Sequence, residues 1–528
     1  MFTFCRQCLL NSIAHKYVVS NNKELYACFI DFSKAYDLVN RELLWQKLTN
    51  YGVSDKFVNY MREIYRKVEA CVKLDPQHVT ESFSSQLGLR QGDCLSCINF
   101  LLYLGDIADY FRSHSATEIN IGNLYLTLLM YADDLCIVDT TAKGLRRKIN
   151  LLAKYCELVG MKINIDKSKT VHFRKSLRTQ TNFSWYIDTQ PLETVNQYKY
   201  LGLYIHGTCS WKSAVYDICL RANRAIMLMF ANLKRFGNVP VPLLLKLFDS
   251  KIVPILLYGS EVWGLSAGDL PNIEKVANCF YRRILGLKKN TPIALVRGEL
   301  GRHSMSHLVK CRVVKFWIKL LKCGEHRAIK MVYQYEYHLS QTSRACWATS
   351  LKSVLFKMGF GDVWQNQGAG DFEVFHQIYK QRSRDIDGQN WHTLLGDSGN
   401  LKIYRVIKLE LSIAPFLLLD LSKKVTNCLV RLRGSLLRIG ANEGRWKRVP
   451  YEQRTCEMCN SGLVDDEIHY LFDCRAWSSF RQPLNQYAVF RTHDLVNIFD
   501  CREKSLFTDL FLYVKRTLSF RQEILQTL

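Results

Sequence analysis

The chain has 528 residues, of which 48% are hydrophobic, so it is long enough to bury the cores of two to four domains. Its 72 Lys and Arg outnumber its 48 Asp and Glu, and the net charge of +24 fits either a partner with a phosphate backbone or a merely soluble basic protein. No apolar run could span a bilayer and the first residues lack a signal pattern, while the 19 scattered cysteines indicate reduced thiols and at most one metal site.

The first 205 residues carry the pattern of a mixed layer of strands and helices. Leu25–Ile30 is a short, fully apolar run that ends at Asp31, which predicts an interior strand. Two further apolar runs, 124–130 and 135–138, flank residues 131–134 and predict a hairpin with two carboxylates at its tip. Because strands and helices alternate here, we expect an α/β or α+β architecture.

Two amphipathic helices are predicted beside these strands, because apolar positions recur at spacings of three and four residues. The first helical face comprises Phe57, Tyr60, Met61, Ile64 and Val68, and the second comprises Leu145, Ile149, Leu152, Cys156 and Val159.

From about residue 206 onward the pattern is mainly helical. Apolar spacings predict helices near 213–235, 241–250, 268–285, 305–323 and 371–382. The stretch 324–450 gives no clear boundary. A compact Cys/His cluster follows Pro450, and a last helical segment follows the cluster.

Three carboxylates carry the strongest chemical signal. If the strand that ends at Asp31 lies beside the hairpin that carries Asp133 and Asp134, three hard oxygen ligands converge. Two Mg²⁺ ions in such a place could clamp the attacking and leaving oxygens of a phosphoryl displacement, which predicts nucleotidyl transfer. A Tyr-x-Asp-Asp sequence alone is weak evidence, because two aspartates also suit an ordinary solvated hairpin tip.

Five segments, in order, resemble the palm motifs of reverse transcriptases. They are 29–37 (FIDFSKAYD), 89–96 (LRQGDCLS), 131–134 (YADD), 160–169 (GMKINIDKSK) and 198–202 (YKYLG). An ordered set of this kind is far more specific than any one motif. The chain therefore resembles the reverse transcriptases of non-LTR retrotransposons.

The resemblance implies roles in catalysis for five residues. Asp31 and Asp133 would be the main Mg²⁺ ligands, with Asp134 beside them and the backbone carbonyl of Phe32 completing one coordination sphere. Lys167 would protonate the leaving pyrophosphate, although it could equally be one lysine of a solvated basic turn.

Further roles concern the nucleotide and the primer. Tyr36 would be the aromatic steric gate that excludes a ribose 2′-hydroxyl, the alternative being an ordinary core aromatic. Gln91 and Gly92 would support the incoming nucleotide and template base, since glycine lets backbone approach a ligand closely. The primer grip would consist of Tyr200, Leu201 and Gly202.

The sequence departs from the family pattern in two places. Cys94 and Cys97 stand where the second motif usually has proline, so that they could join Cys5 and Cys8 in a four-cysteine zinc site or mark a loosened loop. Only about 30 residues precede Asp31, so the fingers are expected to be largely missing and an endonuclease domain absent.

A second metal site is predicted near the end of the chain. Cys456, Cys459, His469 and Cys474 have the spacing C-x₂-C-x₉-H-x₄-C, which is suited to tetrahedral zinc and would fold a segment too small for its own core. The alternative is a chance grouping of reduced thiols and a histidine.

The basic stretch 429–449, which precedes this cluster, is predicted to bind nucleic acid through phosphate contacts and stacking. Its alternative is a solvated amphipathic helix. The candidate contacts are Arg431, Arg433, Arg438, Arg445, Trp446, Lys447 and Arg448.

Together these features predict an α+β chain with a right-hand polymerase palm, an antiparallel sheet with packed helices. The expected domains are a palm (1–205), a thumb with connecting helices (206–323), a helical C-terminal region with the basic patch (324–450), a CCHC zinc knuckle (451–480) and a helical tail (481–528).

The expected function is RNA-directed DNA polymerisation with Mg²⁺, with an RNA template, a DNA primer or target and deoxynucleoside triphosphates as partners. The protein is expected inside the cell, in the nucleus or cytoplasm as a ribonucleoprotein. A non-catalytic RNA-binding remnant is the main alternative, favoured by the missing fingers and opposed by the intact carboxylates. An intron maturase or telomerase-like enzyme would share the palm, but the zinc knuckle argues against it.

Overall fold

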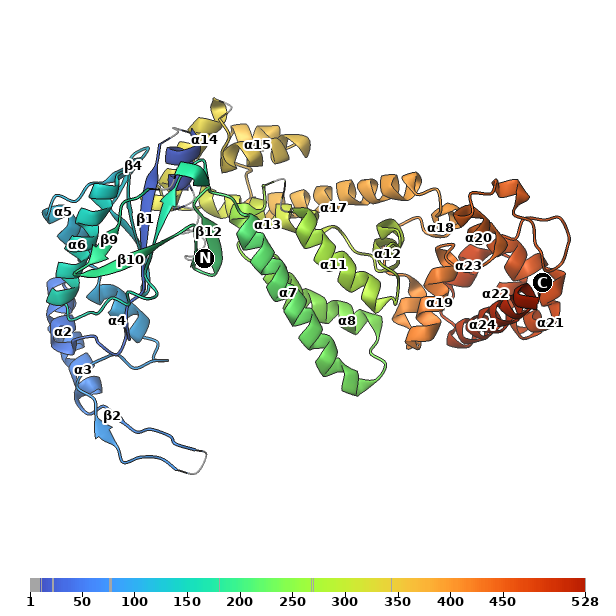
Figure 1. Ribbon diagram of the computed structural model, residues 1–528, viewed down its shortest axis with the longest axis horizontal. Helices are drawn as coiled ribbons and strands as arrows, with labels where there is room; N and C mark the ends of the chain where they lie inside the picture. Colours follow the sequence, from blue (N-terminus) through green and yellow to red (C-terminus); the bar gives the residue numbers. More distant parts are fainter. Residues whose placement is uncertain are drawn as a thin grey trace. The chain divides into compact units, whose positions relative to one another are not determined.

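The computed structural model describes residues 10, 12–20, 23–75, 78–179, 181–266, 268, 270–342 and 344–527 (Figure 1). The chain forms two compact units. The first comprises Met1–Ala214, Glu261–Leu265 and Phe316–Gly368, and the second comprises Val215–Ser260, Ser266–Lys315 and Ala369–Leu528. Within the described residues, no helix is both long enough and apolar enough to cross a membrane.

The first unit is built on a six-stranded sheet with the order β6-β7-β1-β8-β10-β9. The strands are β6 (Leu128–Tyr131), β7 (Asp134–Asp139), β1 (Leu25–Ile30), β8 (Lys169–Phe173), β10 (Gln190–Val195) and β9 (Trp185–Ile187). Neighbours are antiparallel except β8 and β10, which are parallel, so the expected antiparallel sheet is in fact mixed. All six residues of β1 are buried, which confirms the predicted interior strand.

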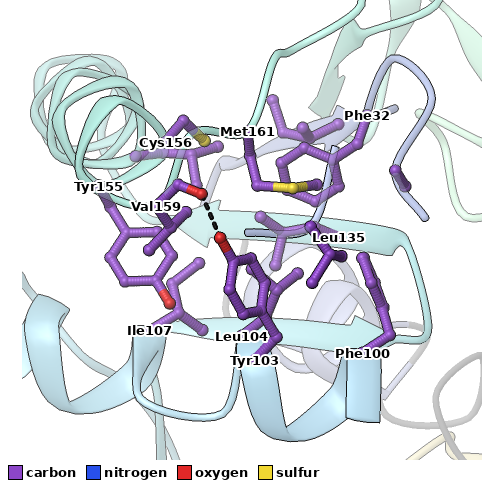
Figure 2. Packing of buried hydrophobic residues seen from close by; sticks show 14 of the residues in the cluster. Phe32, Phe100, Tyr103, Leu104, Ile107, Leu135, Tyr155, Cys156, Val159 and Met161 are labelled. Atoms are coloured by element: carbon purple, nitrogen blue, oxygen red, sulfur yellow. Dashed lines mark hydrogen bonds between the residues drawn. The ribbon is translucent and has the colours of Figure 1, made fainter. Parts of the chain in front are cut away.

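Helices cover one face of this sheet and share a hydrophobic core with it. They are α2 (Arg41–Asn50), α3 (Asp55–Arg66), α4 (Ser96–Tyr103), α5 (Ile107–Ser113) and α6 (Ala142–Leu158). Figure 2 shows the close packing of Tyr103 and Ile107 with Tyr155 and Cys156 of α6, and the Tyr103 hydroxyl donates to the carbonyl of Val159.

The predicted face of α6 is confirmed, because Leu145, Ile149, Leu152 and Cys156 are all buried. The predicted face of α3 is confirmed only in part, because Met61 is buried and Ile64 and Val68 pack partly buried against the core. Its buried residues are Val58, Met61 and Tyr65, whereas Phe57 and Tyr60 are 45% and 64% exposed. The helix is rotated away from the expected face, because tertiary packing rather than the local apolar spacing selects the buried side.

Three small hairpins complete the strands of this unit. They are β2 (Glu69–Ala70) with β3 (Phe83–Ser84), β4 (Ile119–Ile121) with β5 (Leu124–Leu126), and β11 (Gln197–Tyr200) with β12 (Leu203–His206). The hairpin predicted around residues 131–134 is confirmed, although its first strand begins only at Leu128. A bend at Thr127 separates β5 from β6, because β5 pairs with β4 across a turn at Gly122, whereas β6 pairs with β7.

The boundaries of the compact units do not follow the predicted domain ranges 206–323 and 324–450, because residues 316–368 pack with the first unit. This segment contains the end of α13 (Met305–Leu321), α14 (Ala328–Gln341), α15 (Trp347–Lys357) and α16 (Gly361–Gln365). Two of its indoles donate hydrogen bonds, one within the segment and one to Glu261 of the same unit. Trp317 Nε1 donates to Tyr333 Oη at 2.6 Å, and Trp347 Nε1 donates to the carbonyl of Glu261 at 2.9 Å.

The second unit is helical. It contains most of α7 (Lys212–Leu233), α8 (Val241–Leu247), η4 (Phe248–Ile252), α9 (Val253–Leu256), α11 (Leu270–Ile284), α12 (Ile293–Glu299), most of α13, α17 (Phe372–Asp397), α18 (Lys402–Ile407), α19 (Lys423–Arg433), α20 (Gly440–Trp446), α23 (Leu495–Asp500) and α24 (Lys504–Thr527). The helices predicted near 213–235, 241–250, 268–285 and 305–323 are confirmed, and the one predicted at 371–382 extends much further, to Asp397.

Candidate catalytic site and metal centre

Strand pairing brings the predicted palm carboxylates to one edge of the sheet. Ile30, the last residue of β1, lies opposite Leu135 of β7, so Asp31 follows β1 beside Asp134 at the start of β7. Tyr131 pairs with Asp134 and closes a tight turn at Ala132 and Asp133, where Ala132 takes a φ of 52°. The condition set by the sequence, that the two strands be neighbours, is met.

The alternation of side chains along the strands decides which face carries these carboxylates. Ile30 and Leu135 belong to the core that contains α6, so Asp31 and Asp134, one residue away, point to the opposite face. On that opposite face Phe29 stacks on Tyr198 with ring centroids 4.4 Å apart. Burial, followed by the charges of Asp134 and Asp31, raises the pKa of Tyr198 to about 12. The carboxylates and α6 therefore lie on opposite sides of the sheet.

The negative charges at this edge act on one another. Burial, followed by the charges of Asp133 and Asp31, raises the pKa of Asp134 to about 6. Like charges held together in this way are the setting in which a divalent cation with oxygen ligands is stabilising. Asp31, Asp133 and Asp134 offer the oxygen donors that a divalent cation such as Mg²⁺ prefers.

The segment predicted as the fourth motif lies against Asp31. The backbone N–H of Asp31 donates to Ser168 Oγ at 3.1 Å, its carbonyl accepts from the N–H of Asn164 at 2.8 Å, and Phe32 forms a bridge with Ile163. Lys167 is exposed, and its Nζ lies 3.9 Å from a carboxylate oxygen of Asp31. Its ammonium group is thus solvent-exposed and pairs with the carboxylate of Asp31.

The residues predicted to contact the nucleotide surround Tyr36. Its ring stacks on Phe100 with centroids 4.7 Å apart, and its hydroxyl lies 3.7 Å from Cys97 Sγ. Burial, and then Cys97, raises the pKa of Tyr36 to about 12, so the phenol stays neutral. Gln91 Nε2 donates to a carboxylate oxygen of Asp37 at 3.3 Å.

A glycine-dependent loop joins these two motifs. Gly88 has a φ of 85°, and a Cβ there would lie 2.9 Å from backbone atoms of Asp37. Gly92 has a φ of 93°, which also favours glycine. Asp37 is a residue that the assignment of roles missed, although it stands in the first palm motif.

The predicted primer grip is the hairpin of β11 and β12. Tyr200 is buried and its ring lies 5.3 Å from that of Phe29, on the face that carries the carboxylates. Leu201 and Gly202 form the turn with φ values of 48° and 82°. Tyr198 of the same hairpin was assigned no role from the sequence, yet the charges of Asp134 and Asp31 act on its hydroxyl.

Among the described residues, the set Cys456, Cys459, His469 and Cys474 has ligand atoms that all lie within 4.8 Å of one another. The Cys456 and Cys474 sulfurs are 3.8 Å apart, and Cys459 Sγ is 3.4 Å from His469 Nε2. Tetrahedral zinc with Zn–S bonds of about 2.3 Å and Zn–N bonds of about 2.0 Å requires separations of about 3.8 Å and 3.5 Å. The four residues therefore fit zinc.

Local turns bring these four ligands together. The N–H of Cys456 donates to the carbonyl of Leu463 at 2.8 Å, and the N–H of Cys474 donates to the carbonyl of His469 at 2.8 Å. A hydrogen bond from the Cys474 thiol lowers the pKa of Cys456, which favours its thiolate. A thiolate is the form that binds metal.

The predicted basic patch divides into buried and exposed residues. Arg433 is 2% exposed, pairs with Glu299 at 2.7 Å and lies over the rings of Tyr404, Phe416 and Phe499. Its assignment as a nucleic-acid contact is wrong, because a guanidinium with a buried partner serves the core.

The remaining members of the patch differ in exposure. Arg431 and Arg445 are half-buried and donate to the carbonyls of Leu436 and Ser435, at 3.3 and 3.4 Å. The exposed residues are Arg438, Trp446, Lys447 and Arg448. The patch is thus smaller than the sequence predicts.

The four cysteines of the alternative zinc site fall in two segments. Cys94 lies just before α4 and Cys97 in its first turn, and both are exposed, whereas Cys5 and Cys8 lie outside the described residues.

Comparison with known proteins agrees with this geometry. Residues 2–205 match the family model described as reverse transcriptase (RNA-dependent DNA polymerase). The chain is 26% identical over 302 residues to the retrovirus-related Pol polyprotein from type-2 retrotransposable element R2DM of Drosophila melanogaster. The matched segment covers 54% of this chain and 27% of that polyprotein.

A second relative is the Pol polyprotein from type-1 retrotransposable element R2 of Popillia japonica. It is 24% identical over 299 residues, which cover 54% of this chain and 40% of the relative. The chain thus spans less than half the length of these curated relatives. Among solved structures, the similarity to a telomerase of Candida tropicalis is low, with 13% identity, a TM-score of 0.30 and coverage of 72% of this chain and 51% of that one.

The matched family model, the R2 relatives and the five ordered motifs converge on one conclusion. Residues 2–205 match the reverse transcriptase family, and about half of the chain is similar to Pol polyproteins of R2 retrotransposable elements, which supports a reverse transcriptase of the non-LTR retrotransposon kind.

Proposed function

We propose that this chain is an RNA-directed DNA polymerase that extends a primer 3′-end on an RNA template by two-metal nucleotidyl transfer. The observation that carries the proposal is the placement of Asp31, Asp133 and Asp134 at one sheet edge, where burial and then the charges of Asp133 and Asp31 raise the pKa of Asp134 to about 6. The reverse transcriptase family of residues 2–205 supports it.

In this proposal Mg²⁺, when bound, activates the primer 3′-hydroxyl and stabilises the departing pyrophosphate. Asp31 and Asp133 hold the cations with the backbone carbonyl of Phe32, and Asp134 adds negative charge that strengthens their binding. Lys167, exposed and 3.9 Å from Asp31, delivers a proton to the leaving group.

Nucleotide selection is assigned to the loop around Tyr36. Its ring, fixed by Phe100, would lie against the sugar and exclude a 2′-hydroxyl. Gln91, oriented by Asp37, and Gly92 would support the incoming nucleotide and the template base. Tyr200, Leu201 and Gly202 would hold the primer end near the carboxylates.

At the other end of the chain, Cys456, Cys459, His469 and Cys474 are proposed to bind one Zn²⁺ as a CCHC knuckle. The exposed Trp446, with Arg438, Lys447 and Arg448, would then contact single-stranded or structured RNA by stacking and phosphate contacts.

Primer extension by the purified full chain tests the polymerase. The assay uses an RNA template, a DNA primer, deoxynucleotides and Mg²⁺, with Asp133→Asn beside the wild type and the exposed Asp188→Asn as a matched control. We expect extension by the wild type and the control, and a loss of about 10³-fold or more in Asp133→Asn, since a metal ligand is removed. Undiminished extension by Asp133→Asn would exclude these carboxylates as the active site.

The same assay separates the polymerase from its main alternative. Absence of extension in every variant, with RNA binding retained, would identify a binding protein whose palm keeps its carboxylates without catalysis.

A further inference from the structure

Helix α6 carries a basic stripe on the side that faces away from the core. Lys143, Arg146, Arg147 and Lys154 are all exposed and, with Asn150 between them, line an open surface hollow. At 100° per residue these five positions fall within about 100° of the helix circumference. With a rise of about 1.5 Å per residue, the stripe is about 16 Å long.

The stripe is opposite the buried face of the same helix. Leu145, Ile149, Leu152 and Cys156 pack into the core, and their mean direction is about 150° from that of the basic stripe. On the buried face Lys148 is fully compensated, since its Nζ donates to the carbonyl of Val138 at 2.7 Å and pairs with Asp139 at 3.1 Å.

The cations of the stripe have no such compensation. In the described part of the chain, no ion pair involves Lys143, Arg146, Arg147 or Lys154. Glu157, beyond Lys154, is the acidic residue at the end of the stripe. Like charges three and four residues apart disfavour a helix, so folding gains nothing from this arrangement. The exposed cations are available to a polyanion.

The stripe is on the other side of the sheet from the proposed catalytic carboxylates. Ile30 and Leu135 pack with the buried face of α6, so Asp31 and Asp134, one residue away on their strands, face away from this helix. The thickness of the helix alone, with side chains, is about 10 Å. The stripe therefore lies on a second surface of the first unit.

We propose that the outer face of α6 binds the phosphate backbone of double-stranded RNA outside the catalytic site. Lys and Arg make phosphate contacts that carry no sequence information. Asn150, in the middle of the stripe, can both donate to and accept from a 2′-hydroxyl, which Lys and Arg cannot do, and this favours RNA over DNA. The site binds RNA whether or not the palm catalyses.

Binding to a 20-base-pair RNA duplex tests the proposal on the full chain. A saturating short template–primer first occupies the catalytic site, and the dissociation constant of the duplex is then measured across a salt series. The test variant is Lys143→Gln, Arg146→Gln, Arg147→Gln and Lys154→Gln combined. The control has the same composition on exposed positions of the same unit, Lys319→Gln, Arg327→Gln, Arg344→Gln and Lys357→Gln.

We expect the test variant to bind the duplex at least about tenfold more weakly near 0.15 M salt, with a salt slope reduced by about three to four, since each lost phosphate contact removes about one unit. The control should keep both values within about twofold of the wild type. Primer extension on the short template–primer should be unchanged in both variants, since neither touches the carboxylates.

Two results would overturn the proposal. An unchanged affinity and salt slope in the test variant would show that the outer face of α6 does not bind the duplex. If a DNA duplex of the same sequence binds the wild type as tightly, and the test variant weakens its binding equally, the surface does not prefer RNA. If the fourfold variant does not fold, two double variants replace it, Arg146→Gln with Arg147→Gln and Lys143→Gln with Lys154→Gln. Each should show about half of the expected change in affinity and salt slope.

Discussion

The two candidate metal sites are assembled in opposite ways. Asp31 and Asp133 are separated by about a hundred residues and meet only because β1 pairs with β7 in a six-stranded sheet. The four ligands Cys456 to Cys474 lie within one short segment, and their own turns bring their sulfur and nitrogen atoms within 4.8 Å. One site depends on a whole domain, and the other on a few local hydrogen bonds.

The comparison also concerns charge. The palm site brings together carboxylates that repel one another, so that the fold must hold them in place until a hard cation neutralises them. The Cys/His site brings together groups that are neutral or singly charged, and the metal would supply much of its folding free energy. We therefore expect the palm to fold without its ions and the Cys/His segment to need its ion.

Removal of zinc should have the largest effect. Cys474→Ser should lose the bound metal and with it folding free energy of the 451–480 segment on the order of 10 kcal/mol. The measurement is zinc content together with amide hydrogen exchange of that segment in the full chain. Cys501→Ser, a partly exposed cysteine of the same unit, is the control and should keep one zinc. Equal protection of the segment with and without zinc would contradict the assignment.

The next effect concerns the helix that supports the Cys/His segment. Arg521 of α24 pairs with Asp465 at 2.6 Å, and both side chains are almost fully buried. Arg521→Gln leaves a buried carboxylate without its cation and should destabilise the second unit by about 3–5 kcal/mol in chemical denaturation. Arg516→Gln, on the exposed side of the same helix, should change the unfolding free energy by less than about 0.5 kcal/mol. Equal effects of the two substitutions would show that the buried pair has no special role.

A smaller effect of opposite sign is expected in the palm. The pKa of Asp134 is raised to about 6 in the folded chain, so its ionisation destabilises the fold relative to the unfolded chain, in which the carboxyl titrates near pH 4. Stability of the metal-free protein should therefore fall as pH rises from about 4 to 6 and stay lower above that range.

The substitution Asp134→Asn removes the loss of stability that ionisation of Asp134 causes. Without divalent cations, it should be more stable than the wild type at pH 7.5 by about 1–2 kcal/mol and equal to it below about pH 4. Thermal denaturation at several pH values measures the difference, and Asp188→Asn is the control. A variant that is less stable than the wild type at pH 7.5 would show that the carboxylates do not repel one another.

The smallest effect tests the proton donor. Lys167→Gln should lower the rate of primer extension by about tenfold or more, since general acid catalysis contributes at least that much, while primer–template affinity changes little. Lys162→Gln, which removes an exposed lysine of the same turn, should leave the rate nearly unchanged. Equal rates for both variants would assign Lys167 to the solvated turn instead.

Much of the palm could be predicted from local pattern. The apolar run before Asp31 indicated a strand buried on both faces, and the spacing of Leu145 to Cys156 indicated the buried side of α6. The spacing of the four Cys/His ligands indicated a chelating cluster, because its geometry is mostly local. In each case neighbours in the sequence decide the structure.

Where distant contacts decide, the sequence was a weaker guide. The packing of residues 316–368 with the first unit depends on partners far along the chain, and the buried face of α3 depends on its packing against the core. The break between β5 and β6 arises because each strand pairs with a different neighbour, β4 or β7. Arg433 shows the same limit, because a basic residue in a basic stretch looks exposed until Glu299 and three aromatic rings surround it.

The sequence by itself determined the chemistry of this protein, because the order of the palm motifs and the types and spacing of the ligands are properties of the chain. Only the tertiary structure decided that Asp31 and Asp134 share one face of the sheet and that the basic stripe of α6 lies on the other. The reason is physical, since residue types set which interactions are possible, and strand pairing and packing set which groups are near enough to interact.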